Sequence, residues 1–312
     1  MNDRTDLPPE GAPIPAREPS FIERNNLSPI AFALICLFVI FLLYQIVGGA
    51  LTFFLVGTKV TVENVMQHRT LTLVGQSLFV LIPTLLFARL LDKKFSAVFP
   101  WRMPRVGETI FASLGLLFLQ EIFQVYLFFQ DRIPLPEELR KLLDPIKEMI
   151  EEMFKTLVST HSVPELLFVI LVVAVTPAIV EELLFRGLIQ TSFERVLRPA
   201  RAALITGIIF GAFHFNPFAI VPLMGLGWYF GYLRMRSKSM VLAMTVHFLN
   251  NVLAVIVVYF QMDDQMLIGA SKGPDVNMPA IIAQLFLFIA LFVVSFSSYL
   301  RATSSFRTGS EE

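Results

Sequence analysis

The stretch that decides the fold runs from residue 164 to residue 190 and reads PELLFVILVVAVTPAIVEELLFRGLIQ. About 20 predominantly apolar residues are enough to cross a lipid bilayer as a helix, so this stretch is long enough to span one. It nevertheless contains Glu181, Glu182 and Arg186, which are costly to place in lipid and are therefore functional candidates. The sequence predicts a membrane-spanning helix that carries polar chemistry.

The composition of the whole chain extends this interpretation. Of the 312 residues, 55% are hydrophobic, only 16% are charged and 31 are Phe, whereas an ordinary soluble domain has about 25% charged residues. These few charged residues cannot cover the surface of a soluble globule of this size. The apolar part of the surface must therefore face a lipid bilayer. Lys and Arg (25) balance Asp and Glu (25), so no net basic field indicates nucleic acid as a partner. The single Cys36 cannot form an intramolecular disulfide.

Apolar runs follow one another along the chain and predict an all-α, polytopic transmembrane helical bundle of about eight spans, which occupies residues 29–300. We place the spans at 29–57, 70–88, 109–130, 164–190, 202–214, 217–233, 239–261 and 279–300. The fifth and sixth are short and are separated by Pro217, so they can form a broken or re-entrant pair. Residues 1–28 are polar and proline-rich, which predicts a disordered cytoplasmic tail, and residues 301–312 form a polar C-terminal tail.

The segment 135–158 has a different pattern. Its apolar residues recur at i, i+3, i+4 and i+7 with charges between them, which predicts an amphipathic helix with one apolar stripe. Two interpretations remain open, a helix that lies on the membrane surface or caps the bundle, and a substrate gate.

The basic residues of the loops indicate the orientation, because cytoplasmic loops carry an excess of Lys and Arg. An N-terminus inside the cell places the basic segments 89–108, 191–201 and 234–238 in the cytoplasm. The opposite side then holds Lys59, Arg69 and Lys272. Both termini are therefore predicted to be cytoplasmic, in a multi-pass protein of a bacterial plasma membrane.

Few ionisable residues fall inside the predicted spans, and each is a candidate by default. Besides the group in the fourth span they are Glu121, His214 and His247, whereas His68 and His161 are predicted to be surface residues of polar loops. On a helix, Glu182 and Arg186 share a face and can form an ion pair. Glu181 is turned about 100° away and stays unpaired, which suits a general base acting on water. The alternative for the three charges is a structural network that joins helices.

Two further motifs lie on the following spans. Phe210-x-x-x-His214 places an aromatic ring and an imidazole on one helix face, and Gly211 and Ala212 would allow a neighbouring helix to approach closely. His247-x-x-x-Asn251 aims two hydrogen-bond donors at one point, the geometry that an oxyanion hole requires.

The depths of these residues agree. At about 1.5 Å per residue, His214 lies roughly 20 Å from the cytoplasmic start of its helix, and His247 and Asn251 lie about 12 and 18 Å deep. Glu181 lies about 13 Å deep if its helix continues to about residue 190. All four residues can then meet in one cavity that opens to the cytoplasm.

The ordered set of motifs resembles the CPBP intramembrane protease family, which includes the CAAX prenyl endopeptidases and the bacteriocin-processing and immunity proteins. The motifs are Glu181-Glu182-x-x-x-Arg186, then Phe210-x-x-x-His214, then His247-x-x-x-Asn251, and the resemblance covers residues 164–261. It implies an endopeptidase with a membrane-associated protein or peptide as substrate. It also implies that Glu181 and His214 activate a water, that His247 and Asn251 hold the oxyanion, and that Glu182 and Arg186 support the site.

The sequence argues against other protease chemistries. It has no His-Glu-x-x-His zinc motif and no Gly-x-Ser-x-Gly nucleophile motif. We therefore expect no cofactor, although Glu181, His214 and His247 are legitimate zinc ligands and a zinc site built from them stays an alternative. Two alternatives of another class also remain, namely a non-proteolytic immunity or scaffold protein of the same fold, and a transporter, which would show an inverted repeat that we do not find.

Overall fold

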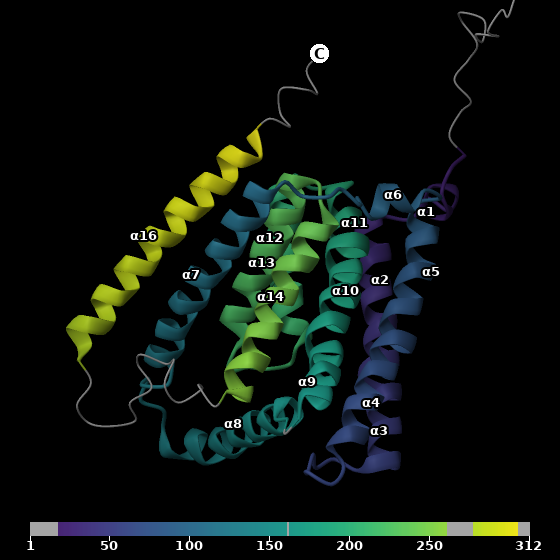
Figure 1. The fold of residues 1–312 in the computed structure, drawn as a ribbon. Coiled ribbons are helices and arrows are strands. Elements are labelled where there is room, and N and C mark those ends of the chain that lie inside the picture. Colours follow the sequence, from purple (N-terminus) through teal and green to yellow (C-terminus); the bar gives the residue numbers. More distant parts are fainter. Residues whose placement is uncertain (1–17, 161, 261–276, 305–312) are drawn as a thin grey trace, which may run out of the picture.

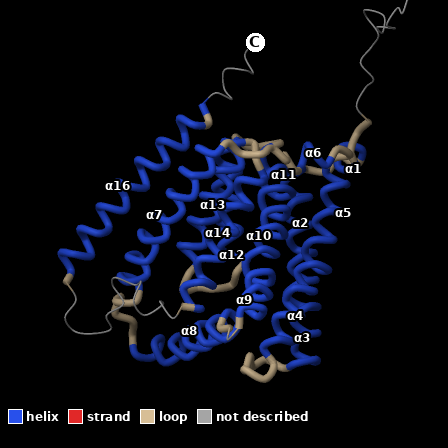
Figure 2. Tube along the Cα trace, in the orientation of Figure 1, coloured by secondary structure: helices blue, strands red, loops and turns tan. Residues whose placement is uncertain are grey.

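The computed structural model describes residues 18–160, 162–260 and 277–304, and these residues form helices joined by loops, without a β-strand (Figure 2). The prediction of an all-α helical bundle is confirmed. The first span combines α2 (Pro29–Phe41), the π-helical segment η1 (Leu42–Gly48) and α3 (Gly49–Val56). The second combines α4 (Val65–Gly75), the π-helical segment η2 (Gln76–Leu81) and α5 (Ile82–Leu91). The third is α7 (Val106–Gln130), and the last is α16 (Met278–Ala302).

The central span is the longest, because one continuous helical path covers Val163–Glu194. It consists of α9 (Val163–Val169), η3 (Ile170–Val175), α10 (Thr176–Glu182), η4 (Leu183–Ile189) and α11 (Gln190–Glu194), where η3 and η4 are π-helical. Pro177 follows η3 and lacks the N–H that would continue the regular ladder. The Thr176 hydroxyl donates instead to the Leu171 carbonyl at 2.7 Å, which satisfies part of the disrupted turn.

Six helices of the described residues are long and apolar enough to cross a membrane, and they correspond to six of the eight predicted spans. The other two predicted spans are α12 (Pro199–Phe213), which is a shorter apolar helix, and α13 (Ile220–Ser237). The seventh predicted span is α14 (Met240–Tyr259). Large apolar side chains on the outer faces remain exposed, for example Phe54 at 80% and Phe286 at 66%, as expected for helices that face lipid.

The helices α12 and α13 pack directly against each other because glycines remove the side chains between them. A Cβ added at Gly207 would lie 2.3 Å from the backbone nitrogen of Trp228, and one added at Gly211 would lie 2.7 Å from that of Met224. The predicted close approach at Gly211 is therefore present, whereas Ala212 is exposed. The turn after α12 allows this short antiparallel pair to form inside the bundle.

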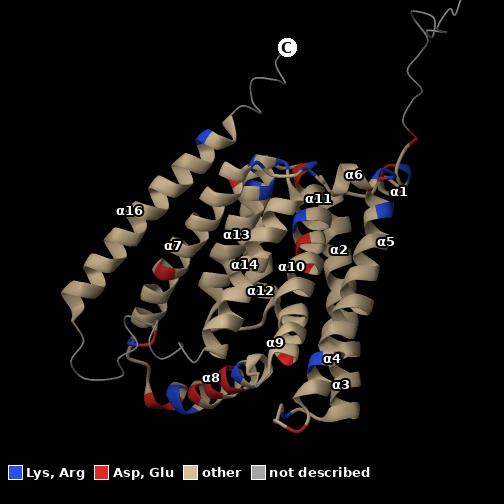
Figure 3. Ribbon diagram, viewed as in Figure 1, with Lys and Arg blue, Asp and Glu red and all other residues tan. Residues whose placement is uncertain are grey.

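The amphipathic segment forms α8 (Glu137–Val158), which lies across the end of the bundle opposite to α1 (Phe21–Arg24) and to the C-terminal end of α16 (Figure 1). Charged residues of both signs alternate along it (Figure 3). Most of its apolar stripe is exposed, including Leu142 at 62% and Met149 at 61%. The predicted helix is present, and the exposed stripe is compatible with a helix that rests on the membrane surface.

Two local expectations differ from the structure. Within the predicted 1–28 tail, residues 21–24 form α1, because Ser20 and Glu23 make a capping box and Ile22 is buried against the core. His68 and Arg69 lie in the first turns of α4 rather than in a loop, and both are buried. Residues 1–17, 305–312, His161 and Lys272 lie outside the described residues.

Candidate functional site

The predicted site residues come from three elements that meet inside the bundle. Glu181 and Glu182 end α10, His214 caps the C-terminus of α12, and His247 lies two turns into α14. The central helix continues to Glu194, so the condition that we set for the depth of Glu181 is met. Two apolar clusters flank the site, one between α2, α5, η4 and α12 and the other between α7, α13, α14 and α16.

Glu182 is fully buried and connects two of these elements through one oxygen. Its Oε1 lies 3.1 Å from Nη1 of Arg186 and 2.9 Å from Nδ1 of His247. The predicted pairing of Glu182 with Arg186 is therefore present, with both side chains fully buried. Because two positively polarised groups face one carboxylate, the cost of burying its charge is offset locally.

Arg186 is held by more than this ion pair. Its Nη2 donates to the Gly227 carbonyl at 2.9 Å, and its guanidinium lies 4.4 Å from the ring centroid of Phe210 and 5.4 Å from that of Phe230. Aromatic faces attract a guanidinium, most strongly where water is excluded. The arginine therefore joins η4 to α12 and α13 and fixes the position of Glu182.

His247 is buried and its imidazole ring is oriented on two sides. The ring stacks on Phe230 with centroids 4.9 Å apart and an interplanar angle of 19°. Its Nδ1 donates to Glu182, so the opposite nitrogen, Nε2, is turned toward Glu181 and lies 4.0 Å from Oε2. A histidine held through one nitrogen presents the other nitrogen for chemistry.

His214 is oriented in the same way by the end of its helix. Its backbone N–H bonds to Gly211 instead of Phe210, and its Nδ1 lies 2.7 Å from the Phe210 carbonyl, to which it donates. The next residue, Phe215, has a φ of +52°, a left-handed conformation that ends helices. The free Nε2 of His214 therefore faces Glu181 and lies 3.8 Å from Oε2.

Glu181 stands between the two imidazoles. Its Oε2 is buried and has no hydrogen-bond partner among the described residues, and both Nε2 atoms are too far for a direct hydrogen bond. The Glu181 side chain is 23% exposed and that of His214 is 29% exposed. The two imidazole nitrogens therefore converge on one carboxylate oxygen without bonding to it directly.

Asn251 lies one turn beyond His247 on the same face of α14, as the i, i+4 spacing requires. Its Oδ1 accepts a hydrogen bond of 3.0 Å from Asn250. Asn250 in turn accepts from Gln120 of α7. Sequence reasoning missed Gln120, Phe230 and Gly227, and for Gln120 the signal was present, since an amide inside an apolar span needs a partner.

The remaining candidate of the spans, Glu121, lies on α7 and accepts a hydrogen bond of 3.4 Å from Gln284 of α16. None of its described contacts is with the three elements of the site, so the structure does not bring Glu121 together with Glu181. Among the described residues, no group of three or more His, Cys, Asp or Glu side chains is arranged to hold a metal ion.

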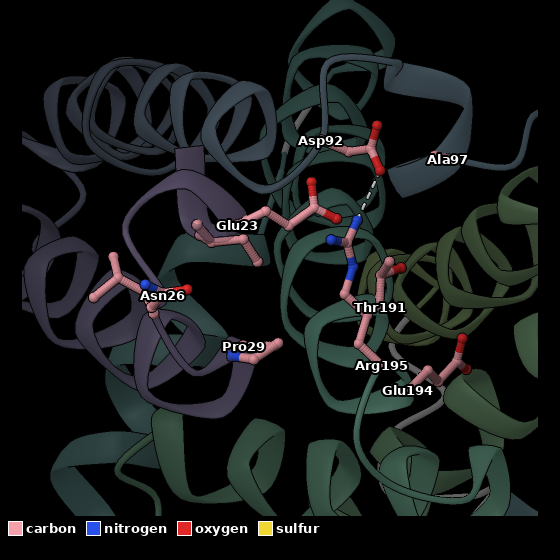
Figure 4. Close-up of a pocket in the computed structure, with 10 residues that line it drawn as sticks. Glu23, Asn26, Pro29, Asp92, Ala97, Thr191, Glu194 and Arg195 are labelled. Atoms are coloured by element: carbon pink, nitrogen blue, oxygen red, sulfur yellow. Dashed lines mark hydrogen bonds and ion pairs between the residues drawn. The ribbon is translucent and has the colours of Figure 1, made fainter. Parts of the chain in front are cut away.

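A cavity of about 790 Å³ lies elsewhere, at the end of the bundle that carries α1 (Figure 4). It is lined by residues of the segments 22–29 and 191–195, by Asp92, and by Ala97 of α6 (Phe95–Val98). Several of its charged side chains pair with each other or with neighbours, as Arg195 does with Asp92 at 2.8 Å and Glu194 with Arg234 at 2.6 Å. This cavity contains none of the predicted site residues.

The fold and the site together define a class of protein, an integral membrane protein with carboxylate and imidazole groups gathered inside its helical bundle. Residues 163–253 match the family described as "Type II CAAX prenyl endopeptidase Rce1-like". The match agrees with the CAAX protease (CPBP) family that the motifs of this segment indicated, and it supports a peptidase of the CAAX protease type. Comparisons with curated proteins and with solved structures give no match.

Proposed function

We propose that this protein is an intramembrane endopeptidase that hydrolyses a peptide bond near the C-terminus or in the membrane-proximal part of a membrane-associated substrate. The observation that carries the proposal is the arrangement around Glu181, whose buried Oε2 is faced by Nε2 of His214 at 3.8 Å and Nε2 of His247 at 4.0 Å. The family of residues 163–253 supports the same class of reaction. Two imidazoles oriented toward one carboxylate suit general acid–base catalysis better than a purely structural network.

The first step uses Glu181 and His214. Because Nδ1 of His214 donates to the Phe210 carbonyl, Nε2 of the neutral ring is an acceptor. A water held between this nitrogen and Glu181 loses a proton to the carboxylate as its oxygen attacks the substrate carbonyl carbon. The proton then passes from Glu181 to the amine that leaves when the C–N bond breaks, so the carboxylate is regenerated.

The developing oxyanion needs donors, and His247 and Asn251 supply them in this proposal. Nδ1 of His247 is engaged by Glu182, so Nε2 can donate only from the doubly protonated imidazolium. That form is balanced electrically, because Glu181 and Glu182 carry two negative charges while Arg186 and the imidazolium carry two positive charges. Stabilisation of the transition state by fixed donors of this kind is commonly the largest single contribution to the rate.

The mechanism needs no metal. If zinc were bound, Glu181, His214 and His247 would hold it, and the ion would polarise the carbonyl and acidify the water. The side chain one turn after His247 is an amide, a good oxyanion donor but a weak zinc ligand. We therefore expect purified enzyme shown by elemental analysis to be free of metal to cleave its substrate. Activity that follows zinc occupancy one for one would contradict this expectation.

The test of the function compares wild-type protein with Glu181→Gln, both reconstituted in liposomes with a farnesylated CAAX peptide and followed by mass spectrometry. The wild type should release the C-terminal tripeptide, and the variant should not, because Gln keeps the shape but cannot accept a proton. Glu121→Gln is the matched control, since it makes the same exchange in another span and should stay active. Full activity in folded Glu181→Gln would refute the assignment of the base.

The substrate class has its own readout. Mass spectrometry of membrane peptides from cells that produce the wild type or Glu181→Gln should reveal products that depend on Glu181. If these products come from a protein without a prenyl group, the assignment as a protease stands, but the assignment of a CAAX substrate is wrong. A peptide profile that is identical in the two strains would favour a non-proteolytic role.

A further inference from the structure

Three carboxamide side chains form a hydrogen-bonded chain that ends at the candidate oxyanion donor. Nε2 of Gln120, on α7, donates to Oδ1 of Asn250, on α14. Nδ2 of Asn250 then donates to Oδ1 of Asn251 at 3.0 Å. All three side chains are partly buried, so these bonds form where the local dielectric is low and each bond is strengthened.

The direction of this chain matters for catalysis. A carboxamide has an acceptor end and a donor end, and Gln120 occupies the acceptor end of Asn250. The donor end of Asn250 is therefore turned toward Asn251 and occupies its oxygen. The NH₂ group of Asn251 is left to face a partner that carries negative charge. If these hydrogen bonds ran in the opposite direction, Asn251 would present its oxygen, which repels an oxyanion.

Helix α7 is well placed to impose this direction. The Tyr229 hydroxyl of α13 donates to the Ala112 carbonyl of α7 at 2.7 Å, and a Cβ added at Gly115 would lie 2.4 Å from the same hydroxyl oxygen. These contacts, eight and five residues before Gln120, fix the height of α7 beside the site. The helix lies outside the segment 163–253 that matches the protease family.

We infer that Gln120 is a positioning residue, which sets the orientation of the Asn251 carboxamide through Asn250. This inference rests on the proposed function, since it assigns to α7 a part in the oxyanion site. Gln120 touches neither Glu181 nor the two histidines in any described contact, so it acts through Asn251.

The experiment is a double-mutant cycle between Gln120→Met and Asn251→Ala, measured on the peptide that the wild type cleaves in liposomes. Met keeps the length of Gln and removes the donor. Gln124→Met is the matched control, because Gln124 lies one turn further along α7 and is exposed. Thermal unfolding of each variant is measured in parallel, and Asn250→Ala repeats the test if Gln120→Met does not fold.

Gln120→Met should lower kcat about 10-fold with KM within about twofold, less than the 10²–10³-fold expected for loss of the donor itself. Gln124→Met should change neither constant. In the Asn251→Ala background, Gln120→Met should cost nothing further, because the residue that it orients is absent.

The outcomes separate the two levels of the proposal. If Asn251→Ala lowers kcat but Gln120→Met does not, or if the two losses multiply, the positioning role is wrong and the oxyanion assignment stands. If Asn251→Ala leaves kcat unchanged, the oxyanion assignment itself is wrong, and the role of Gln120 falls with it.

Discussion

At the scale of single residues, the site depends on one carboxylate oxygen that serves two partners. Oε1 of Glu182 faces both Arg186 and His247, and all three side chains are buried. Removing one partner of a buried ion pair lowers the free energy of unfolding by more than the intact pair contributes to it, because the remaining buried charge is left without compensation. Arg186 is therefore expected to matter for stability and for the orientation of His247.

Arg186→Ala should lower the free energy of unfolding by about 3–5 kcal/mol, measured by chemical denaturation in detergent. Lys141→Ala is the control, since Lys141 forms an i, i+4 pair with Glu137 whose side chains are 72% and 79% exposed. It should change stability by no more than about 0.5 kcal/mol. Equal effects of the two substitutions would contradict the burial argument.

At the scale of elements, the contact between α12 and α13 positions His214, because α12 carries the histidine at its C-terminus. Gly207→Ala should destabilise the protein by about 1–3 kcal/mol, since the new Cβ would meet the α13 backbone and neither helix can yield easily. Gly49→Ala in α3 is the matched control, because no atom lies within 4 Å of its Cβ position. A control variant that is as unstable as Gly207→Ala would show that the close approach does not decide the result.

The amphipathic helix α8 is held at its C-terminal end by hydrogen bonds from Arg69. The buried Arg69 of α4 bonds to carbonyl oxygens at the end of α8, from Leu157 at 2.9 Å and Ser159 at 2.5 Å, and to Glu165 of α9 at 2.6 Å. An arginine can supply these bonds from its planar fork, whereas a lysine cannot. The end of α8 is thereby tied to two membrane helices.

Arg69→Lys should increase hydrogen exchange in residues 154–160, measured by mass spectrometry, while the start of α8 exchanges as before. Arg140→Lys provides the control, because it makes the same exchange at an exposed position of α8. If the exchange of the last turn stays unchanged in Arg69→Lys, the arginine does not hold α8.

At the scale of the whole molecule, α1 and the C-terminal end of α16 lie at one end of the bundle and α8 at the other (Figure 1). The short basic loops predict that the end with α1 is cytoplasmic. Ala97→Cys, in α6, should then react with a membrane-impermeant thiol reagent only from the cytoplasmic side. Glu63→Cys, in the loop before α4, should react only from the other side, and reaction of both from one side would exclude this topology. The native Cys36 is buried and should not react with the thiol reagent.

Much of the candidate site followed from local patterns in the sequence. Glu182 and Arg186 lie four residues apart, and a helix repeats every 3.6 residues, so their spacing placed them on one face. The apolar runs located the spans, because a helix satisfies its own backbone hydrogen bonds inside a lipid bilayer. The eight runs agree with eight helical stretches in order and approximate bounds. Six of these meet the length and composition of a membrane span.

Other features depended on contacts between residues far apart in the chain. No local pattern shows that Arg69 is buried, since its partners lie at the end of α8 and in α9. Nor does any local pattern show that Nδ1 of His247 meets Glu182 while its ring stacks on Phe230. Helical periodicity turns a side chain toward a face, but only packing decides which atoms it meets there. The sequence by itself therefore determined the helices and the candidate residues of the site, whereas the tertiary structure decided the orientation of each imidazole and amide.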